Sequence, residues 1–258
     1  MRNLSRISTY LSSLFLVGLF GIATPTPASA LDFGWGAKVT GSGTVKSETR
    51  AVSGYTGIAL SVPAVADIVQ GSSEGIVIET DDNILPLIET VIEDSKLKIR
   101  FKDRNMSVST KTLKMTINVK TIDSLAVAGA GNLRASKLQA GKLKTSIAGS
   151  GDVRITALDV DTLAVSIAGS GDFAAGGKAN SVEAKIAGSG NLKIGTLASG
   201  SVKISIAGSG DATVWAKESL TISVAGSGDI SYYGDPKVKQ SVAGSGSVKR
   251  LGAAPSGV

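Results

Sequence analysis

Hydrophobic and polar residues alternate with a period of two along most of the chain, and glycine-rich segments interrupt this alternation at regular distances. One unit consists of the alternating segment Leu143–Ile147, the glycine-containing segment Ala148–Asp152 and a second alternating segment, Val153–Ile155. Such alternation is typical of β-strands with one buried face, and glycine permits a corner that a residue with a Cβ adopts only at a cost. Each unit is therefore predicted to contain two short strands and two corners.

The glycine-rich segment, with the sequence A-G-S/A-G, occurs seven times, and successive copies are 18 to 20 residues apart. A fixed period of this length is typical of a solenoid, in which each unit forms one rung and equivalent strands pair in parallel about 4.8 Å apart. The pattern predicts an all-β fold, a right-handed parallel β-helix of about seven regular rungs over residues 123–250. A β-sandwich would explain the alternation but not the fixed period. The copies begin at Ala128, Ala148, Ala168, Ala187, Ala207, Ala225 and Ala243.

Stacked rungs place equivalent residues in columns. One hydrophobic column is expected to face inward and consists of Leu143, Leu163, Val182, Val202, Leu220 and Val238. One serine column is expected to face outward, with Lys185 interrupting it, and consists of Ser146, Ser166, Ser205, Ser223 and Ser241.

Residues 39–122 are less regular, and we expect either irregular rungs or a β cap that covers the first rung, because an exposed strand edge promotes association. Gly41–Lys46 resembles a degenerate corner, and Asp81–Asn83 could cap one helical turn over residues 84–88, which Pro86 keeps from being longer. The strand candidates are residues 58–62, 66–70, 75–80, 96–101 and 113–119.

The two chain ends differ in composition from the rest. Residues 1–30 combine Arg2 and Arg6 with the apolar run Leu11–Ala23 and an A-x-A site at Ala28–Ala30, which is the pattern of a cleaved signal peptide. The sequence therefore predicts secretion across the inner membrane to the periplasm or the cell exterior, with no integral membrane segment after cleavage. Residues 31–38 are predicted to be a linker and residues 251–258 a disordered tail.

Composition narrows the chemistry. The 258 residues include no Cys and no His, which excludes disulfides, thiolate chemistry, zinc-imidazole sites and Ser-His-Asp catalysis. The net charge of +6 falls to +4 without residues 1–30 and is not concentrated beside aromatic residues, so no nucleic-acid partner is expected. The protein is predicted not to be an enzyme. A polysaccharide lyase or hydrolase is the weaker alternative, because no pair of carboxylates stands out from the repeat.

Several short motifs in order resemble one bacterial family. They are Thr49–Ile58, Gln70-Gly71, Asp82–Leu85, Ser95–Ile99 and the repeated Ala-Gly-Ser-Gly-Asp, and together they span roughly residues 40–249. The chain resembles the family called "putative auto-transporter adhesin, head GIN domain". The resemblance implies a secreted β-helical domain whose biochemical activity is not established, with adhesion suggested by the family's name.

An acidic and amide column follows the corners. A column of carboxylates either binds cations, with calcium as the candidate cofactor, or accepts hydrogen bonds from turn N–H groups. Calcium prefers 6 to 8 oxygen ligands, and one carboxylate per rung supplies few of them. The candidate metal residues are Asp152, Asp172, Asp211 and Asp229, and Asn132, Asn191 and Ser247 complete the column.

A basic strand is the first candidate binding site. Cations alternate with Leu97, Ile99 and Phe101 and would share one face, where they could bind an acidic polysaccharide or lipopolysaccharide phosphate, helped by a partial column of Arg134, Arg154, Lys193 and Lys249. The alternative is a solvated edge strand whose lysines block strand addition. The cations are Lys96, Lys98, Arg100, Lys102 and Arg104.

The second candidate binding site is a carbohydrate surface formed by the flat Ser, Ala and Gly faces with three aromatic residues. Trp215, Tyr232 and Tyr233 fall in neighbouring rungs and could meet in space, although large aromatics also fill the last rungs of a solenoid. The sequence thus favours a non-enzymatic envelope or extracellular binding module that contacts glycan. The alternative is a structural protein that self-associates as a homo-oligomer and has no dedicated ligand.

Overall fold

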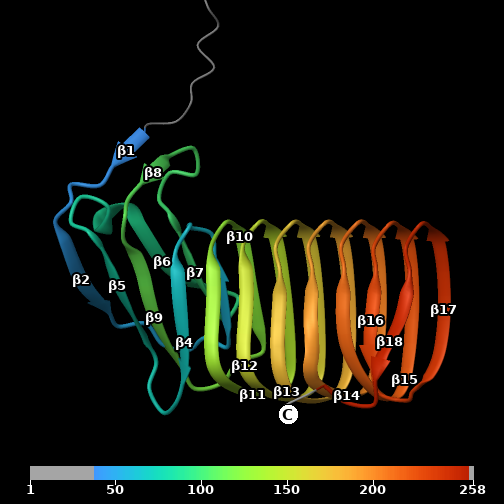
Figure 1. Ribbon diagram of the computed structural model, residues 1–258. Helices are drawn as coiled ribbons and strands as arrows, with labels where there is room; N and C mark the ends of the chain where they lie inside the picture. Colours follow the sequence, from blue (N-terminus) through green and yellow to red (C-terminus); the bar gives the residue numbers. More distant parts are fainter. Residues whose placement is uncertain (1–37, 256–258) are drawn as a thin grey trace, which may run out of the picture. The chain divides into compact units, whose positions relative to one another are not determined.

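The computed structural model describes residues 38–255, which form an all-β solenoid of stacked parallel turns (Figure 1). The predicted signal peptide, residues 1–30, lies outside the described residues. The regular turns begin with β10 (Ser124–Gly129) and continue through β11 (Asn132–Gly149), β12 (Asp152–Gly169), β13 (Phe173–Gly188), β14 (Leu192–Gly208) and β15 (Ala212–Gly226). Each pairs in parallel with the next, so the predicted β-helix is confirmed.

Each regular turn contains three segments rather than the two expected from the repeat. In β11 the buried positions alternate within residues 132–135, 137–140 and 142–149, and two neighbouring exposed residues separate one segment from the next. These pairs are Ser136-Lys137 and Gly141-Lys142. The chain therefore bends twice within one nearly continuous strand, and because Ser136 and Lys137 bend without glycine, the glycine pattern did not reveal that bend.

The inward columns form the hydrophobic core. The column that starts at Leu143 is buried in every turn up to Leu220, whereas Val238 in the last turn is 38% exposed. The outward serine column is also aligned as expected, because Ser166 pairs with Lys185 and Lys185 with Ser205. We call the outward side of residues 142–149 and their register equivalents the serine face, and the outward side of residues 132–135 and their equivalents the arginine face.

The seven corners enclose about six turns. At each stacked corner the serine N–H donates to a glycine carbonyl of the preceding turn, as Ser150 does to Gly129 at 2.9 Å. Gly149 has φ +118°, and a Cβ placed there would lie 2.6 Å from the carbonyl oxygen of Gly129. The corner thus requires glycine both for its backbone conformation and for the close approach of the turn below.

The stack extends beyond β10 in an order that differs from the sequence. β3 (Gly57–Leu60) and β4 (Val65–Gln70) pair in parallel with β10 and β11, and β7 (Lys96–Phe101) and β9 (Leu113–Val119) pair in parallel with β3 and β4. The chain therefore builds one incomplete turn, passes outside it to build another, and then returns to start the regular stack at β10.

Antiparallel strands cover the outermost of these turns. β5 (Gly75–Asp81) pairs with β9, β2 (Val45–Arg50) pairs with β5, and β6 (Ile88–Glu93) pairs with β7. A single 3-10 turn, η1 (Leu85–Leu87), precedes β6, and β1 (Lys38–Thr40) pairs in parallel with β8 (Ser107–Ser109). Residues 39–122 therefore contain both irregular turns and a cover of strands.

Two local expectations for this region are wrong. Residues 41–44 do not form a corner of the stack, because they connect β1 to β2, and β2 runs antiparallel to its neighbour. The side chains of Asp81 and Asn83 do not cap the helical turn, whose first residues have no side-chain cap. They instead accept hydrogen bonds from the N–H groups of Gly43 and Ser42, at 3.0 and 2.9 Å, and hold that connection in place.

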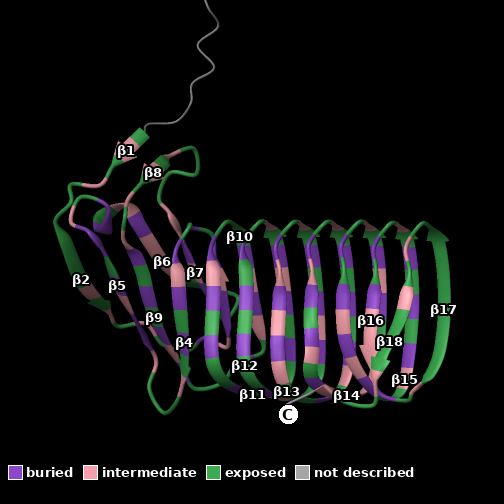
Figure 2. Cartoon of the chain, viewed as in Figure 1, coloured by how far each residue is buried: buried purple, intermediate pink, exposed green. Residues whose placement is uncertain are grey.

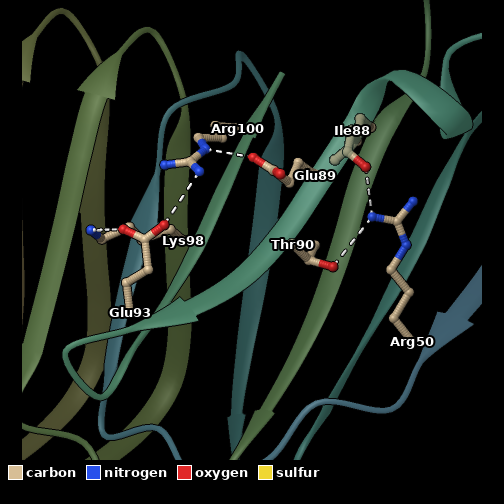
Figure 3. Close-up of polar contacts among 7 residues, drawn as sticks. All are labelled: Arg50, Ile88, Glu89, Thr90, Glu93, Lys98 and Arg100. Atoms are coloured by element: carbon tan, nitrogen blue, oxygen red, sulfur yellow. Dashed lines mark hydrogen bonds and ion pairs between the residues drawn. The ribbon is translucent and has the colours of Figure 1, made fainter. Parts of the chain in front are cut away.

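The cover is joined by Arg50 of β2, whose guanidinium donates to the carbonyl oxygen of Ile88 at 2.7 Å (Figure 3). It also donates to the carbonyl oxygen of Leu85 at 3.0 Å. A further hydrogen bond reaches the hydroxyl of Thr90 at 3.3 Å. Arg50 thus connects β2 to β6, two strands that each pair with only one neighbour.

The last turn consists of β16 (Ile230–Tyr233), β17 (Lys237–Gly244) and β18 (Val248–Gly252). β17 is exposed along its whole length, in contrast to the strands of the preceding turns (Figure 2). Gln240 occupies the position aligned with buried Ile222, so a polar side chain replaces a hydrophobic one where the described stack ends. β18 includes Leu251 and Gly252, so the first two residues of the predicted disordered tail, residues 251–258, are part of a strand.

Candidate binding surfaces

The basic strand is β7, and the structure divides its five cations. Lys96, Lys98 and Arg100 lie within the strand, whereas Lys102 and Arg104 follow its end. β7 has a strand on each side, β3 and β6, so the interpretation of its lysines as protection of a free edge is wrong. β6 is the edge strand of this sheet.

Acidic residues of β6 partly neutralise the basic strand (Figure 3). Arg100 donates to Glu89 at 2.7 Å and to Glu93 at 3.3 Å, and Lys98 donates to Glu93. The hydrogen bond from Lys98 lowers the pKa of the Glu93 carboxyl, and the hydrogen bond to Glu89 raises the pKa of the Arg100 guanidinium. Lys98 and Arg100 are therefore held in place by carboxylates, and Arg104 makes no ion pair with a described residue.

The alternation pattern alone does not reveal these acidic partners, but the sequence contains another signal for them. β6 and β7 are joined by the two residues Asp94 and Ser95, both with positive φ (52° and 58°). That is the backbone of a tight hairpin turn, and such a turn aligns Glu89 with Arg100 and Glu93 with Lys96. A two-residue polar turn between two alternating segments was the available evidence for the hairpin.

A pocket of about 540 Å³ lies beside the basic strand. Lys98, Arg100 and Arg104 line it together with Phe101 and Asp103, and Lys96 and Lys102 do not. The rest of the lining is small and comes from other strands, namely Ala59, Ser61 and Ala128. The fold thus brings three of the five predicted cations to one cavity.

The pocket lies at one end of the serine face. Its lining residue Ala59 aligns with Ala126 of β10, which aligns with Ser146, the first residue of the serine column. Beyond Ser146 the outward positions of this face carry Ser and Ala in two columns, with Lys185 in the serine column, and a third column beside them includes Lys144, Glu183 and Lys203. We call this cavity the basic pocket, and the surface that adjoins it is the serine face.

The three predicted aromatic residues separate into two environments. Trp215 and Tyr233 are aligned on adjacent parallel strands, and both are half-buried. Tyr232 aligns instead with buried Val214 and packs against the core. The ring of Tyr233 lies 3.5 Å from where a Cβ of Gly195 would be, and Lys217 Nζ lies 5.5 Å from the centroid of the Trp215 ring. Trp215 and Tyr233 therefore form the aromatic surface, and Tyr232 fills the end of the core.

The acidic and amide column forms a hydrogen-bond ladder. Oδ1 of each member accepts the backbone N–H of the next member at 2.8–3.2 Å, from Asn132 through to Ser247. Asp172 also accepts a hydrogen bond from Lys193. Burial raises the pKa of the Asp172 carboxyl, but the hydrogen bonds from Lys193 and Asn191 outweigh burial, and the pKa lies below its ordinary value. The alternative that these side chains satisfy turn N–H groups is thus directly observed.

Among residues 38–255, no group of three or more acidic side chains is arranged so that it could hold a metal ion. Each aspartate of the column has a second oxygen that the ladder does not use, although that of Asp172 accepts from Lys193. Calcium binding by Asp152, Asp172, Asp211 and Asp229 therefore stays a prediction.

The described residues thus form a parallel β-solenoid with a basic pocket beside β7. The family model described as "Putative auto-transporter adhesin, head GIN domain" matches residues 54–236, and the chain belongs to this family. The resemblance inferred from the short motifs is confirmed. The family is described as an adhesin and not as an enzyme.

Solved structures support the fold. A structure described as a "putative adhesin" from Bacteroides fragilis is 27% identical, with a TM-score of 0.78, and the match covers 83% of this chain and 100% of that one. A "putative lipid binding protein" from Parabacteroides distasonis is 24% identical, with a TM-score of 0.71 and the same coverage. A "putative adhesin" from Parabacteroides merdae is 24% identical, with a TM-score of 0.67, and the match covers 83% of this chain and 99% of that one.

A comparison with curated proteins found no match. The part of the chain that the structure describes contains no helix long and apolar enough to cross a membrane.

Proposed function

We propose that this protein is an exported, adhesin-like binding module whose basic pocket and serine face bind an acidic glycan, including the phosphorylated sugars of lipopolysaccharide. The observation that carries the proposal is the convergence of Lys98, Arg100 and Arg104 on one pocket of about 540 Å³. Guanidinium and ammonium groups pair with carboxylate and phosphate, and the hydroxyl of Ser61 supplies a further donor and acceptor.

The adjoining serine face supports a ligand longer than one sugar. Its hydroxyls repeat at the spacing of parallel strands, about 4.8 Å, apart from the interruption at Lys185. An alanine column lies on one side of the serine column, and Lys144 and Lys203 lie on the other, so an extended acidic chain could lie along the stack. Phe101 in the pocket offers an apolar surface for a sugar ring. The family's adhesin description agrees with a surface-binding role, and the signal-peptide pattern of residues 1–30 supports export to the periplasm or the cell exterior.

The test is a glycan and lipopolysaccharide array probed with the purified protein at two salt concentrations. The informative variant is Lys98→Gln with Arg104→Gln, because Arg104 has no ion pair with a described residue and Arg100 keeps both of its carboxylate partners. Lys137→Gln with Lys178→Gln is the matched control, since it removes the same charge from two exposed lysines of the segment between the serine and arginine faces, and neither lysine lines a described pocket.

We expect salt-sensitive binding of acidic glycans by the wild-type protein and by the control, and a loss of about tenfold or more in the pocket variant. Equal binding by all three proteins would contradict the assignment of the pocket. No binding by any of them, together with an oligomer that grows with protein concentration, would favour the self-associating structural protein instead.

A further inference from the structure

The arginine face carries a second pair of cations that the basic pocket does not use. Arg134 and Arg154 are aligned on the adjacent parallel strands β11 and β12, and both are exposed. Residues 132–135 and residues 142–149 are different segments of the turn, and the pockets on the two faces share no lining residue. The prediction that Arg134 and Arg154 assist the basic strand is therefore wrong, because they lie on another face.

Arg134 and Arg154 together line two neighbouring hollows, of about 260 Å³ and about 90 Å³. The larger hollow is also lined by Asp67, Ser136 and Thr156. The smaller hollow is also lined by Asn132 and Asp152. Two guanidinium groups thus lie side by side at a surface depression that contains hydroxyl groups.

The described residues leave these guanidiniums without partners. Arg50, Arg100 and Arg250 each donate to a carboxylate or a carbonyl oxygen, whereas Arg134 and Arg154 make no hydrogen bond or ion pair with any residue of the range 38–255. Like charges carried by aligned residues of adjacent strands, which lie about 4.8 Å apart, repel each other unless an anion lies between them. The pair is therefore arranged to receive an anion.

The two nearby carboxylates differ in availability. Asp152 already accepts the backbone N–H of Asp172 at 3.0 Å, as a member of the ladder. Asp67 aligns with Arg134 and lines the larger hollow, but it forms no ion pair within 4.0 Å among the described residues. Asp67 is therefore free to accept a hydrogen bond from a hydroxyl group of a ligand whose anionic group is bound by the two arginines.

From this arrangement we infer that Arg134 and Arg154 form an oxyanion site for a sugar carrying a phosphate or sulfate group. The tetrahedral anion is bound by the two guanidiniums, which donate N–H groups in a planar fork. Asp67, Ser136 and Thr156 contact the hydroxyl groups of the sugar. A hollow of about 260 Å³ limits the ligand to about one sugar residue.

The test is calorimetric titration with glucose 6-phosphate, glucose 6-sulfate, inorganic phosphate and glucose. We expect the two charged sugars to bind about tenfold more tightly than inorganic phosphate, and glucose not to bind. The variant Arg134→Gln with Arg154→Gln should lose binding of all the anions. Two controls, Lys137→Gln with Lys178→Gln and Lys98→Gln with Arg104→Gln, should keep it, which separates this site from the basic pocket.

Asp67→Asn distinguishes a built site from two solvated arginines. If Asp67 accepts sugar hydroxyls, the variant keeps inorganic phosphate but loses most of the preference for the charged sugars. If Asp67 only neutralises Arg134, the variant binds every anion more tightly and the preference is unchanged, which would overturn the role of Asp67. Anion binding that is equal in wild type and in the double arginine variant would overturn the site itself.

Discussion

The regular turns and the N-terminal region are held together in different ways. In the regular turns, backbone ladders and the same glycine corner recur from β10 to β17, so that each contact has several equivalents along the stack. In residues 38–122, single side chains with no equivalent elsewhere join the strands. Arg50 bridges two sheet edges, Asp81 holds the connection before β2, and Tyr55 donates its hydroxyl to the carbonyl of Asn118 at 2.6 Å.

This difference shows what a repeat requires of its sequence. A stacked turn must avoid a Cβ where backbones approach, and otherwise needs only a hydrophobic residue at each inward position. A cover that ends the stack follows no repeat, so individual polar contacts must define its geometry. Substitutions should therefore be most damaging at corner glycines in the turns and at a few polar side chains in the cover.

The largest expected effect is that of Gly149→Ala. The new Cβ would lie 2.6 Å from the Gly129 carbonyl oxygen, and φ of +118° strains any residue other than glycine. We expect a loss of about 3 kcal/mol in the free energy of unfolding, measured by denaturant titration. Gly141→Ala is the matched control in the same strand, because its Cβ would meet only a side-chain oxygen of Asp161 at 3.9 Å. Equal losses in both variants would contradict the importance of the corner.

Arg50→Met tests whether the cover depends on single contacts. The substitution keeps an apolar stem of similar length but removes the guanidinium hydrogen bonds to the carbonyls of Leu85 and Ile88, of which Leu85 still accepts the N–H of Ile88, so we expect a loss of about 2 kcal/mol. The control is Lys46→Met on the same strand, where the side chain is 62% exposed and only approaches Asp82 at 3.6 Å. If the stability of Arg50→Met equalled that of the wild type, backbone pairing and not this side chain would stabilise the cover.

Tyr55→Phe is a smaller test of the same point. The ring stays buried, but the Asn118 carbonyl and the Gly75 N–H lose a partner, so a loss of about 1 kcal/mol is expected in the same titration. Tyr233→Phe is the control, since its hydroxyl has no hydrogen-bond partner among residues 38–255. The comparison fails if the control loses as much stability as Tyr55→Phe.

Because the acidic and amide ladder repeats the same hydrogen bond in every turn, we expect it to tolerate a single substitution. Asp211→Asn keeps the Oδ1 acceptor for the Asp229 N–H and should leave the melting temperature unchanged, whereas Asp211→Ala removes it and should cost about 0.5–1 kcal/mol.

Calcium or a chelator should not change the melting temperature of the wild type, because a ligand that binds only the native state would raise it. A rise with calcium that Asp211→Asn abolishes would support calcium binding by the column instead.

The smallest expected effect is a decrease of the melting temperature at acidic pH. The pKa of Asp172 in the turns and the pKa of Asp82 beside the cover both lie below their ordinary values. For Asp172, burial opposes the shift and hydrogen bonds outweigh it, and for Asp82 the hydroxyl of Ser42 is the main cause. A carboxyl with a lowered folded-state pKa contributes stability above its unfolded value, about 3.9 for Asp, and loses that contribution as the pH falls through the folded value.

The melting temperature should therefore be constant down to about pH 4 and fall below it. Asp172→Asn should make that fall slightly shallower, as measured by thermal unfolding across the pH range. A melting temperature that rises on acidification would contradict the sign of both shifts.

The candidate sites were predictable to different degrees. The cations of β7 could be identified because alternation in a strand places Lys98 and Arg100 on one side. The pocket itself could not, because Ala59 and Ala128 reach it from strands that are distant in sequence. Arg134 and Arg154 were identified as a column, but their assignment to the basic strand was wrong, since the bends that place them on another face contain no repeated glycine signal.

The sequence by itself determined the solenoid, its columns and its corner glycines, because a period of about 20 residues constrains every turn in the same way. Only the tertiary structure decided the order of the turns before β10, the partners of Arg50 and Arg100, and which cations share a cavity. These depend on contacts between segments that occur once in the chain, and such contacts leave no periodic pattern in the sequence.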